Sequence, residues 1–183
     1  FLDAVSGKTA VKYAFFLLYW TGIRLGELLA LNIEDIDFDN KTLSISKSLN
    51  RTKGVDVISL PKTDSSIRTI YLPQFVVDEM KEYCGMLYGR TAKDRLFVLT
   101  KSHLEKEIKR GAELAGLTAI RVHDLRHSHA SLLISKGMNI ATISKRLGHE
   151  NIKTTLNIYG HMFDKDAKDA ADMLDKFYCG EEE

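Results

Sequence analysis

The spacing of apolar residues constrains the fold most, because it describes a series of helices interrupted by one region of short, alternating strands. The 183 residues include twelve glycines but only two prolines, Pro61 and Pro73, so long helices can form between the turns. Hydrophobic residues make up 44% of the chain, enough for a sizeable core. No internal repeat or linker divides the sequence, and we therefore expect one domain.

Helices are predicted where apolar residues recur every three or four positions between capping and turn residues. The first covers about residues 8–19, and the second follows Gly22 and ends near Leu31. Ser102 and Glu105 have the spacing of a capping box, so another helix should begin there. The remaining helical segments are expected over residues 73–87, 102–115, 123–136, 139–147, 152–158 and 163–177. Asn139 and Asn151 are the expected caps of the helices that follow them.

Alternating apolar residues predict the strands. The runs 55–60 and 67–72 flank the polar turn PKTDSS, which is the pattern of a β-hairpin. A turn at residues 39–40 precedes a third strand, in which Leu43 and Ile45 alternate with serines. We therefore expect an α+β fold that is mainly α, with a small three-stranded antiparallel sheet.

The charge is unevenly distributed. The net charge of the chain is +1, but the segment from Asp164 to Glu183 holds eight acidic residues and three lysines. Without them, residues 1–163 keep 23 of the 26 basic groups and 17 of the 25 acidic ones, a net charge of +6. A basic body with an acidic tail suits a domain that faces nucleic acid while the tail points elsewhere.

Other features restrict the protein class. The apolar run AFFLLYW is too short to span a membrane, so we expect no membrane association. Cys84 and Cys179 are far apart and form no CxxC pair, which favours the reducing cytoplasm.

Several polar residues are not required by packing. They are Arg24 in TGIRLGELLAL, His123 and Arg126 in VHDLRHSHAS, His149 in RLGHENIKTT and Tyr159 in LNIYGH. Two guanidiniums can hold the non-bridging oxygens of one phosphodiester, imidazoles can donate hydrogen bonds or move protons, and a phenol can attack phosphorus. This combination can break DNA covalently without a metal ion.

These sequence boxes resemble those of tyrosine recombinases, the integrases of phages and conjugative elements, from the first helix to just past Tyr159. The resemblance implies that Tyr159 is the nucleophile and that it forms a 3′-phosphotyrosine. It also implies that Arg24, Arg126 and His149 bind the phosphate. We expect His123 to accept the proton that the tyrosine loses.

The resemblance further implies a lysine in a β-hairpin turn, which would act as the general acid. Lys62 in PKTDSS is the only lysine of its turn and fits this position, while Lys47, Arg51 and Lys53 are weaker candidates. Glu27, one helical turn after Arg24, is expected to orient the catalytic groups rather than react.

A zinc site is the main alternative for the histidines. His123 and His127 are four residues apart, as in a metal-binding pair, but the HExxH glutamate is absent and no further ligands follow. We therefore expect no metal and no cofactor, and we assign His127 a structural or supporting role.

The resemblance implies a site-specific recombinase that integrates or excises a mobile element. It would act on double-stranded DNA as a tetramer, helped by accessory DNA-bending or excision factors, and be a monomer as an isolated domain. Residues 1–183 would form the catalytic domain, with 163–183 as an acidic C-terminal helix and tail docking on a neighbouring protomer. A separate N-terminal core-binding domain is expected to precede it. A type IB topoisomerase and a non-catalytic DNA-binding domain remain alternatives.

Overall fold

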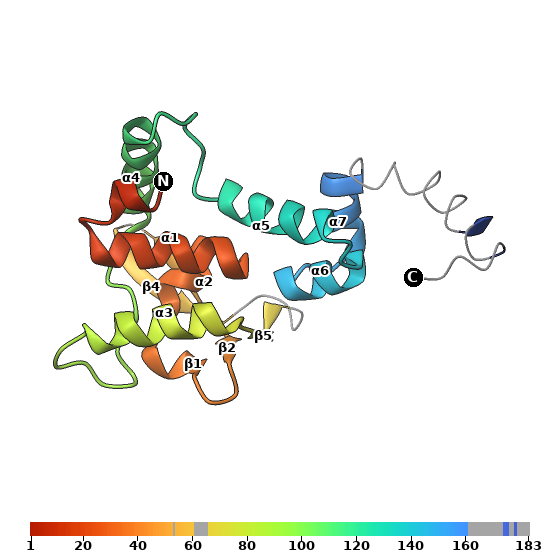
Figure 1. The fold of residues 1–183 in the computed structure, drawn as a ribbon. Helices are drawn as coiled ribbons and strands as arrows, with labels where there is room; N and C mark the ends of the chain where they lie inside the picture. The colour runs from red at the N-terminus through yellow and green to blue at the C-terminus, as the bar shows by residue number, and fades with distance from the viewer. Residues whose placement is uncertain (53, 61–65, 161–173, 176–177, 179–183) are drawn as a thin grey trace.

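Helix α1 (Thr9–Thr21) lies at the centre of the molecule (Figure 1). It contacts α3 (Gln74–Gly85) and α5 (Asp124–Ser135), which lie on different sides of it. Because α1 is packed on several sides, its central residues AFFLL are all buried. The structure, a computed structural model, describes residues 1–52, 54–60, 66–160, 174–175 and 178.

Aromatic stacking fixes α1 against its neighbours. Tyr13 stacks on Tyr83 of α3 with 4.8 Å between ring centroids, and Tyr83 stacks in turn on Phe97 at 5.2 Å. Helices α2 (Leu25–Ala30) and α4 (Lys101–Leu114) pack against each other. The main core of the protein therefore gathers around α1.

A three-stranded antiparallel sheet completes this core, and two of its strands, but not the third, are those that the sequence predicted for it. Its order is β1-β2-β5, and β2 pairs with both neighbours. Leu43 of β2 lies opposite Ile70 of β5, and both side chains are buried. The strands are β1 (Ile36–Asp37), β2 (Thr42–Ile45) and β5 (Arg68–Tyr71).

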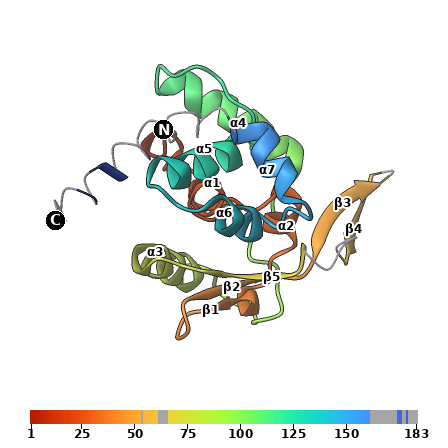
Figure 2. The same cartoon turned by 90° about the vertical axis from the view of Figure 1, so that its right-hand side faces the viewer.

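The predicted strand pairing was wrong. Strand β4 (Val55–Ser59) pairs with β3 (Ser48–Thr52) instead of with the run 67–72, which contributes β5 to the other sheet. Thr52 and Val55 are partners, and Gly54 between them has a φ of 84°, so a tight turn favours this hairpin. Every residue of β4 is exposed, and the hairpin projects from the helical body (Figure 2).

Helices α5, α6 (Ile140–Leu147) and α7 (Ile152–Tyr159) form a second, smaller hydrophobic cluster. Both predicted caps of α6 and α7 are confirmed: Asn139 accepts a hydrogen bond from the Ala141 amide and Asn151 from the Lys153 amide, each at 2.8 Å. The cluster consists of Ala130, Ile134, Ile143, Leu147 and Tyr159.

Of two other predictions about the helices, one was wrong and one concerns residues that the structure does not describe. Helix α4 begins at Lys101, because the Thr100 hydroxyl accepts a hydrogen bond from the His103 amide, so the predicted capping role of Ser102 was wrong. The helix predicted over 163–177 lies outside the described residues, apart from the isolated positions 174–175.

Candidate active site

Arg24 stands at the beginning of α2, where the chain turns after α1. Gly22 ends α1 with a φ of 68°, a conformation that glycine adopts readily. The Glu27 carboxylate accepts hydrogen bonds from the Arg24 amide at 2.8 Å and from its Nη1 at 2.9 Å. Nη2 of Arg24 donates to the Gly148 carbonyl at 3.0 Å. Glu27 thus caps the helix and orients the guanidinium of Arg24.

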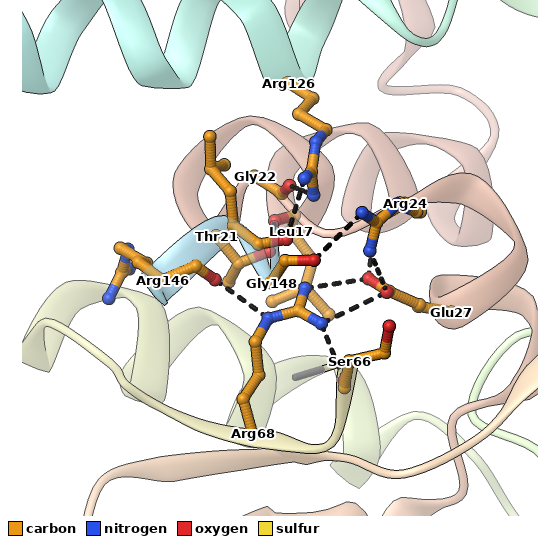
Figure 3. Close-up of polar contacts among 11 residues, drawn as sticks. Leu17, Thr21, Gly22, Arg24, Glu27, Ser66, Arg68, Arg126, Arg146 and Gly148 are labelled. Carbon is orange, nitrogen blue, oxygen red and sulfur yellow. Dashed lines mark hydrogen bonds and ion pairs between the residues drawn. The ribbon is translucent and has the colours of Figure 1, made fainter. Parts of the chain in front are cut away.

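A second arginine, Arg68 of β5, binds the other side of Glu27. Its Nη2 and Nη1 lie 2.8 and 3.1 Å from the two carboxylate oxygens. Its Nε donates to the Arg146 carbonyl at 2.8 Å, and its side chain is only 6% exposed. Burial alone would raise the pKa of Glu27, but hydrogen bonds and charge from Arg68, and then from Arg24, lower it. Glu27 is therefore an anion held between two guanidiniums (Figure 3).

Sequence reasoning missed Arg68, although a signal was present. Arg68, Ile70 and Leu72 occupy alternate positions, so they lie on the same face of the strand. Ile70 and Leu72 are buried, whereas Ile67 and Tyr71 on the opposite face are exposed. An arginine in phase with core positions requires a buried anion or carbonyl partner.

Arg126 of α5 is almost fully buried and binds main-chain oxygens. Its Nη1 donates to the Gly22 carbonyl and its Nη2 to the Leu147 carbonyl, both at 2.7 Å. Burial, followed by the nearby charge of Arg24, lowers the pKa of Arg126 to about 9. That value is still above neutral pH, so the guanidinium remains positive. Figure 3 shows Arg24, Arg68 and Arg126 reaching the same place from three elements.

The C-terminal end of α6 organises this arginine group. A helix leaves its last carbonyls without partners and carries partial negative charge there, which suits cations. The carbonyls of Arg146, Leu147 and Gly148 accept hydrogen bonds from Arg68, Arg126 and Arg24 respectively. The box RLGH thus supplies backbone geometry as well as His149.

His149 follows this turn and stays neutral near pH 7. Burial and then the charges of Arg126, Arg24 and Arg68 lower its pKa to about 4. Its Nδ1 lies 2.7 Å from the Thr155 hydroxyl on α7. A neutral imidazole held at one nitrogen can still use the other to donate to or accept from a substrate.

Tyr159 ends α7 and is only 4% exposed. Its hydroxyl lies 2.7 Å from Nδ1 of His127, a residue expected only to support the site. Burial raises the pKa of Tyr159, and the charge of Arg126 opposes this effect. The structure therefore brings Tyr159 to the arginine group, but places His127 rather than His123 against its hydroxyl.

His123 lies at the beginning of α5 and is exposed. Its ring meets the His127 ring edge to face, with 4.8 Å between centroids. Among the described residues, no group of three or more His, Cys, Asp or Glu side chains is placed to hold a metal ion. Lys62, the expected general acid, lies outside the described residues.

Within the described part of the chain, no helix is long and apolar enough to cross a membrane.

Comparison with solved structures defines the class of the fold, which is that of tyrosine recombinase catalytic domains. The chain is similar to the Tn1549 transposon integrase in complex with transposon right end DNA, with a TM-score of 0.83, 26% identity, and coverage of 94% of this chain and 62% of that one. It is also similar to XerA recombinase, with a TM-score of 0.70, 26% identity, and coverage of 94% and 58%.

The chain belongs to the phage integrase family, whose model matches residues 1–166. The ICEBs1 integrase of Bacillus subtilis is 34% identical over 186 residues, covering 94% of this chain and 50% of that protein. Tyrosine recombinase XerA of Saccharolobus solfataricus is 32% identical over 156 residues, covering 85% and 47%. The chain thus spans about half the length of the curated relatives it matches.

Proposed function

We propose that residues 1–183 are the catalytic domain of a site-specific DNA recombinase that cuts and rejoins strands through Tyr159. The observation that carries this proposal is the convergence of Arg24, Arg126, His149 and Tyr159, which come from four different segments of the chain. Structural packing alone does not require so many cations around one buried tyrosine.

The chemistry follows from charge. Phosphoryl transfer passes through a crowded, negatively charged transition state, so preorganised cations contribute most of the catalysis. Arg24 and Arg126 bind the non-bridging oxygens, and they can do so without large rearrangement because carbonyls and Glu27 already hold them. His149 donates a further hydrogen bond, and His123 faces the DNA from its exposed position.

Tyr159 attacks phosphorus and forms a 3′-phosphotyrosine, and Lys62 protonates the departing 5′ oxygen. The phosphodiester is exchanged rather than hydrolysed, so a 5′ hydroxyl from another strand can reverse the step and complete strand exchange. Because the phosphodiester is conserved, the strand exchange needs neither nucleotide hydrolysis nor a metal ion.

The substrate we propose is double-stranded DNA at the attachment sites of a mobile element. The relatives' names support it: they include the ICEBs1 integrase and the integrase of Staphylococcus phage L54a, and the Tn1549 integrase was solved with transposon DNA. We further propose that the protein acts in the cytoplasm, as a tetramer on DNA with accessory DNA-bending or excision factors, and is a monomer as an isolated domain.

The test is covalent capture from a pool of nicked duplexes with randomised sequence. After denaturation, adducts are separated by gel and their DNA is sequenced, so the cleaved site is read directly from the captured strands. We expect adducts in EDTA with the wild type and none with Tyr159→Phe, which removes only the nucleophilic oxygen. Tyr88→Phe is the matched control, because Tyr88 is 92% exposed and contacts none of the site residues described above.

An adduct with Tyr159→Phe would contradict the assignment of the nucleophile. Absence of any adduct with the wild type would contradict the proposal that the domain cleaves DNA. If the captured strand rejoins only to itself in a two-duplex assay, the protein is a topoisomerase rather than a recombinase.

A further inference from the structure

The contact between Tyr159 and His127 joins the C-terminal end of α7 to the first turn of α5. The Tyr159 hydroxyl and Nδ1 of His127 are 2.7 Å apart, and their ring centroids are 5.8 Å apart. Tyr159 is also fixed by the hydrophobic cluster of α5, α6 and α7. The hydroxyl therefore has a defined partner before any DNA arrives.

The direction of this hydrogen bond depends on the tautomer of His127. Burial raises the pKa of Tyr159 above its ordinary value of 10, despite the charge of Arg126, so the phenol keeps its proton at neutral pH. A protonated phenol can donate to Nδ1 or accept from it, and proton transfer to His127 requires the form in which the hydroxyl donates and the imidazole carries its proton on Nε2.

His123 is less well placed for the same task. It is exposed at the beginning of α5, and it meets His127 through an edge-to-face ring contact. Four residues separate the two histidines, so they lie one helical turn apart on the same side of the segment. His123 thus contacts the His127 ring, whereas His127 itself hydrogen-bonds the Tyr159 hydroxyl.

We propose that His127, rather than His123, takes the proton from Tyr159 during attack on DNA. The inference rests on the proposed function. In the step, the bond from Tyr159 Oη to phosphorus forms and the bond from phosphorus to the 5′ oxygen breaks. The phenolic proton moves to Nδ1 of His127, and Lys62 supplies a separate proton to the 5′ oxygen. No other reactant is required.

The groups that face His127 are compatible with this transfer. Tyr159 faces it from α7, while His123 and Asp124 interact with it electrostatically from its own segment. The carboxylate of Asp124, whose pKa is lowered mainly by a hydrogen bond from Arg121, places a negative charge on the same segment as the imidazolium that forms.

The experiment measures single-turnover cleavage of the duplex selected by covalent capture, with the full chain. His127→Asn keeps an amide oxygen that can accept the hydrogen bond but takes no proton near neutral pH. We expect its cleavage rate at saturating DNA to fall about 100-fold or more, because a general base usually contributes a factor of that size to the rate. His123→Asn is the matched control and should lose clearly less. DNA affinity should stay within about twofold for His127→Asn, since His127 contacts the nucleophile rather than the phosphate.

A second arm distinguishes proton transfer from a structural role. A fluorinated tyrosine at position 159 has a more acidic phenol and needs a base less. It should reduce the loss of cleavage rate caused by His127→Asn to less than about tenfold. It should leave the loss of cleavage rate caused by Lys62→Ala unchanged. Nitrogen-15 NMR of the wild-type imidazoles should show His127 protonated at Nε2 alone, with a shift at Nδ1 in Tyr159→Phe.

Each failure has its own meaning. Cleavage by His127→Asn within about threefold of the wild type overturns this inference and leaves the proposed function intact. The inference is equally overturned if the fluorinated tyrosine does not reduce the loss of cleavage rate caused by His127→Asn. It is also overturned if the NMR spectrum shows the imidazole proton of His127 on Nδ1. A wild type that forms no adduct overturns both. Should His127→Asn fold poorly, His127→Gln takes its place in the same arms.

Discussion

A single carboxylate organises the charged group at the scale of individual residues. Glu27 contacts Arg24 and Arg68, and the carbonyls at the end of α6 take up much of the remaining hydrogen-bonding capacity of the guanidiniums. Arg68 is the most buried of the Glu27 partners, which makes it a positioning residue for Arg24 rather than a group that meets DNA.

Replacing Arg68 by lysine tests this interpretation. A lysine keeps the charge but cannot reach both oxygens of Glu27 and the Arg146 carbonyl at once. We expect Arg68→Lys to lower the free energy of unfolding by about 2 kcal/mol, somewhat less than complete loss of a buried ion pair. Urea denaturation measures this change, and single-turnover cleavage should slow as Arg24 loses its fixed position.

Arg121→Lys is the control. Arg121 also binds a carboxylate, that of Asp124 at 2.9 Å, but its side chain is 80% exposed. Its urea midpoint should match that of the wild type. Equal losses for Arg68→Lys and Arg121→Lys would contradict a special role for Arg68.

At the scale of elements, the turn after α6 brings backbone and arginines together. Gly148 has a φ of 68°, and a Cβ atom added there would lie 2.7 Å from Nη1 of Arg68. The turn after α5 offers a comparison, because Gly137 has a φ of 74° but no atom within 4 Å of the added Cβ. The two glycines share a backbone conformation and differ in their surroundings.

Gly148→Ala should therefore destabilise the protein more than Gly137→Ala. Both variants place an alanine in a left-handed backbone conformation, which costs about 1 kcal/mol of stability. Only Gly148→Ala also displaces Arg68, which should cost at least about 1 kcal/mol more. Thermal unfolding of the two variants measures the difference. Covalent capture should decline for Gly148→Ala alone. Equal thermal shifts would show that Arg68 moves aside without cost.

The contact between α5 and α6 predicts a loss of stability in acid. Nε of Arg146 donates to Nε2 of His129 at 3.1 Å, and His129 is 3% exposed. Burial, followed by the charge of Arg146, lowers the pKa of His129 from 6.5 to about 4. The unfolded chain therefore binds this proton first as the pH falls. Stability should decrease between pH 6.5 and pH 4, by roughly 3 kcal/mol for this group.

Urea unfolding at several pH values checks this expectation. In His129→Gln, an amide oxygen can still accept from Arg146, but the side chain does not titrate. The variant should lose less stability than the wild type over the same pH interval, because only the other groups, including His149, still respond. An identical pH dependence in both proteins would be the contrary result.

The sequence predicted those elements whose signals are local. The caps Asn139 and Asn151 act on their own first turns, so helix boundaries followed from neighbouring residues. The partner of the strand 55–59 did not follow, because alternation shows that a strand exists without showing which strand it meets. A glycine turn next to it decided the pairing.

The site was predictable as a set of residue types, and less so as a set of contacts. The arginines and Tyr159 were identified from their boxes, and the structure brings them together. The distance from the hydroxyl to His127 depends on how α7 packs on α5 and α6, which sequence spacing does not determine. Arg68 was missed for a similar reason, since its partner Glu27 lies 41 positions away.

At the scale of the whole molecule, one chain brings together residues that are far apart in sequence. Arg24 contacts the carbonyl of Gly148, 124 positions away, and Arg126 contacts that of Gly22, 104 positions away. Helices from both ends of the described chain thus meet at one place beside α1 (Figure 1). The arginines and Tyr159 are consequently fixed by the core of the same subunit.

That arrangement determines how defective subunits behave when mixed. Tyr159 is buried against helices α5 and α6 of its own chain, so each copy supplies the tyrosine for its own arginines. Combining Tyr159→Phe with Arg126→Ala should not restore cleavage, because no subunit then has a full set. Restoration on mixing would mean that subunits exchange α7. In the proposed tetramer on DNA, cutting should therefore scale with the number of intact copies, and a defect in one copy should stay with the strand that this copy holds.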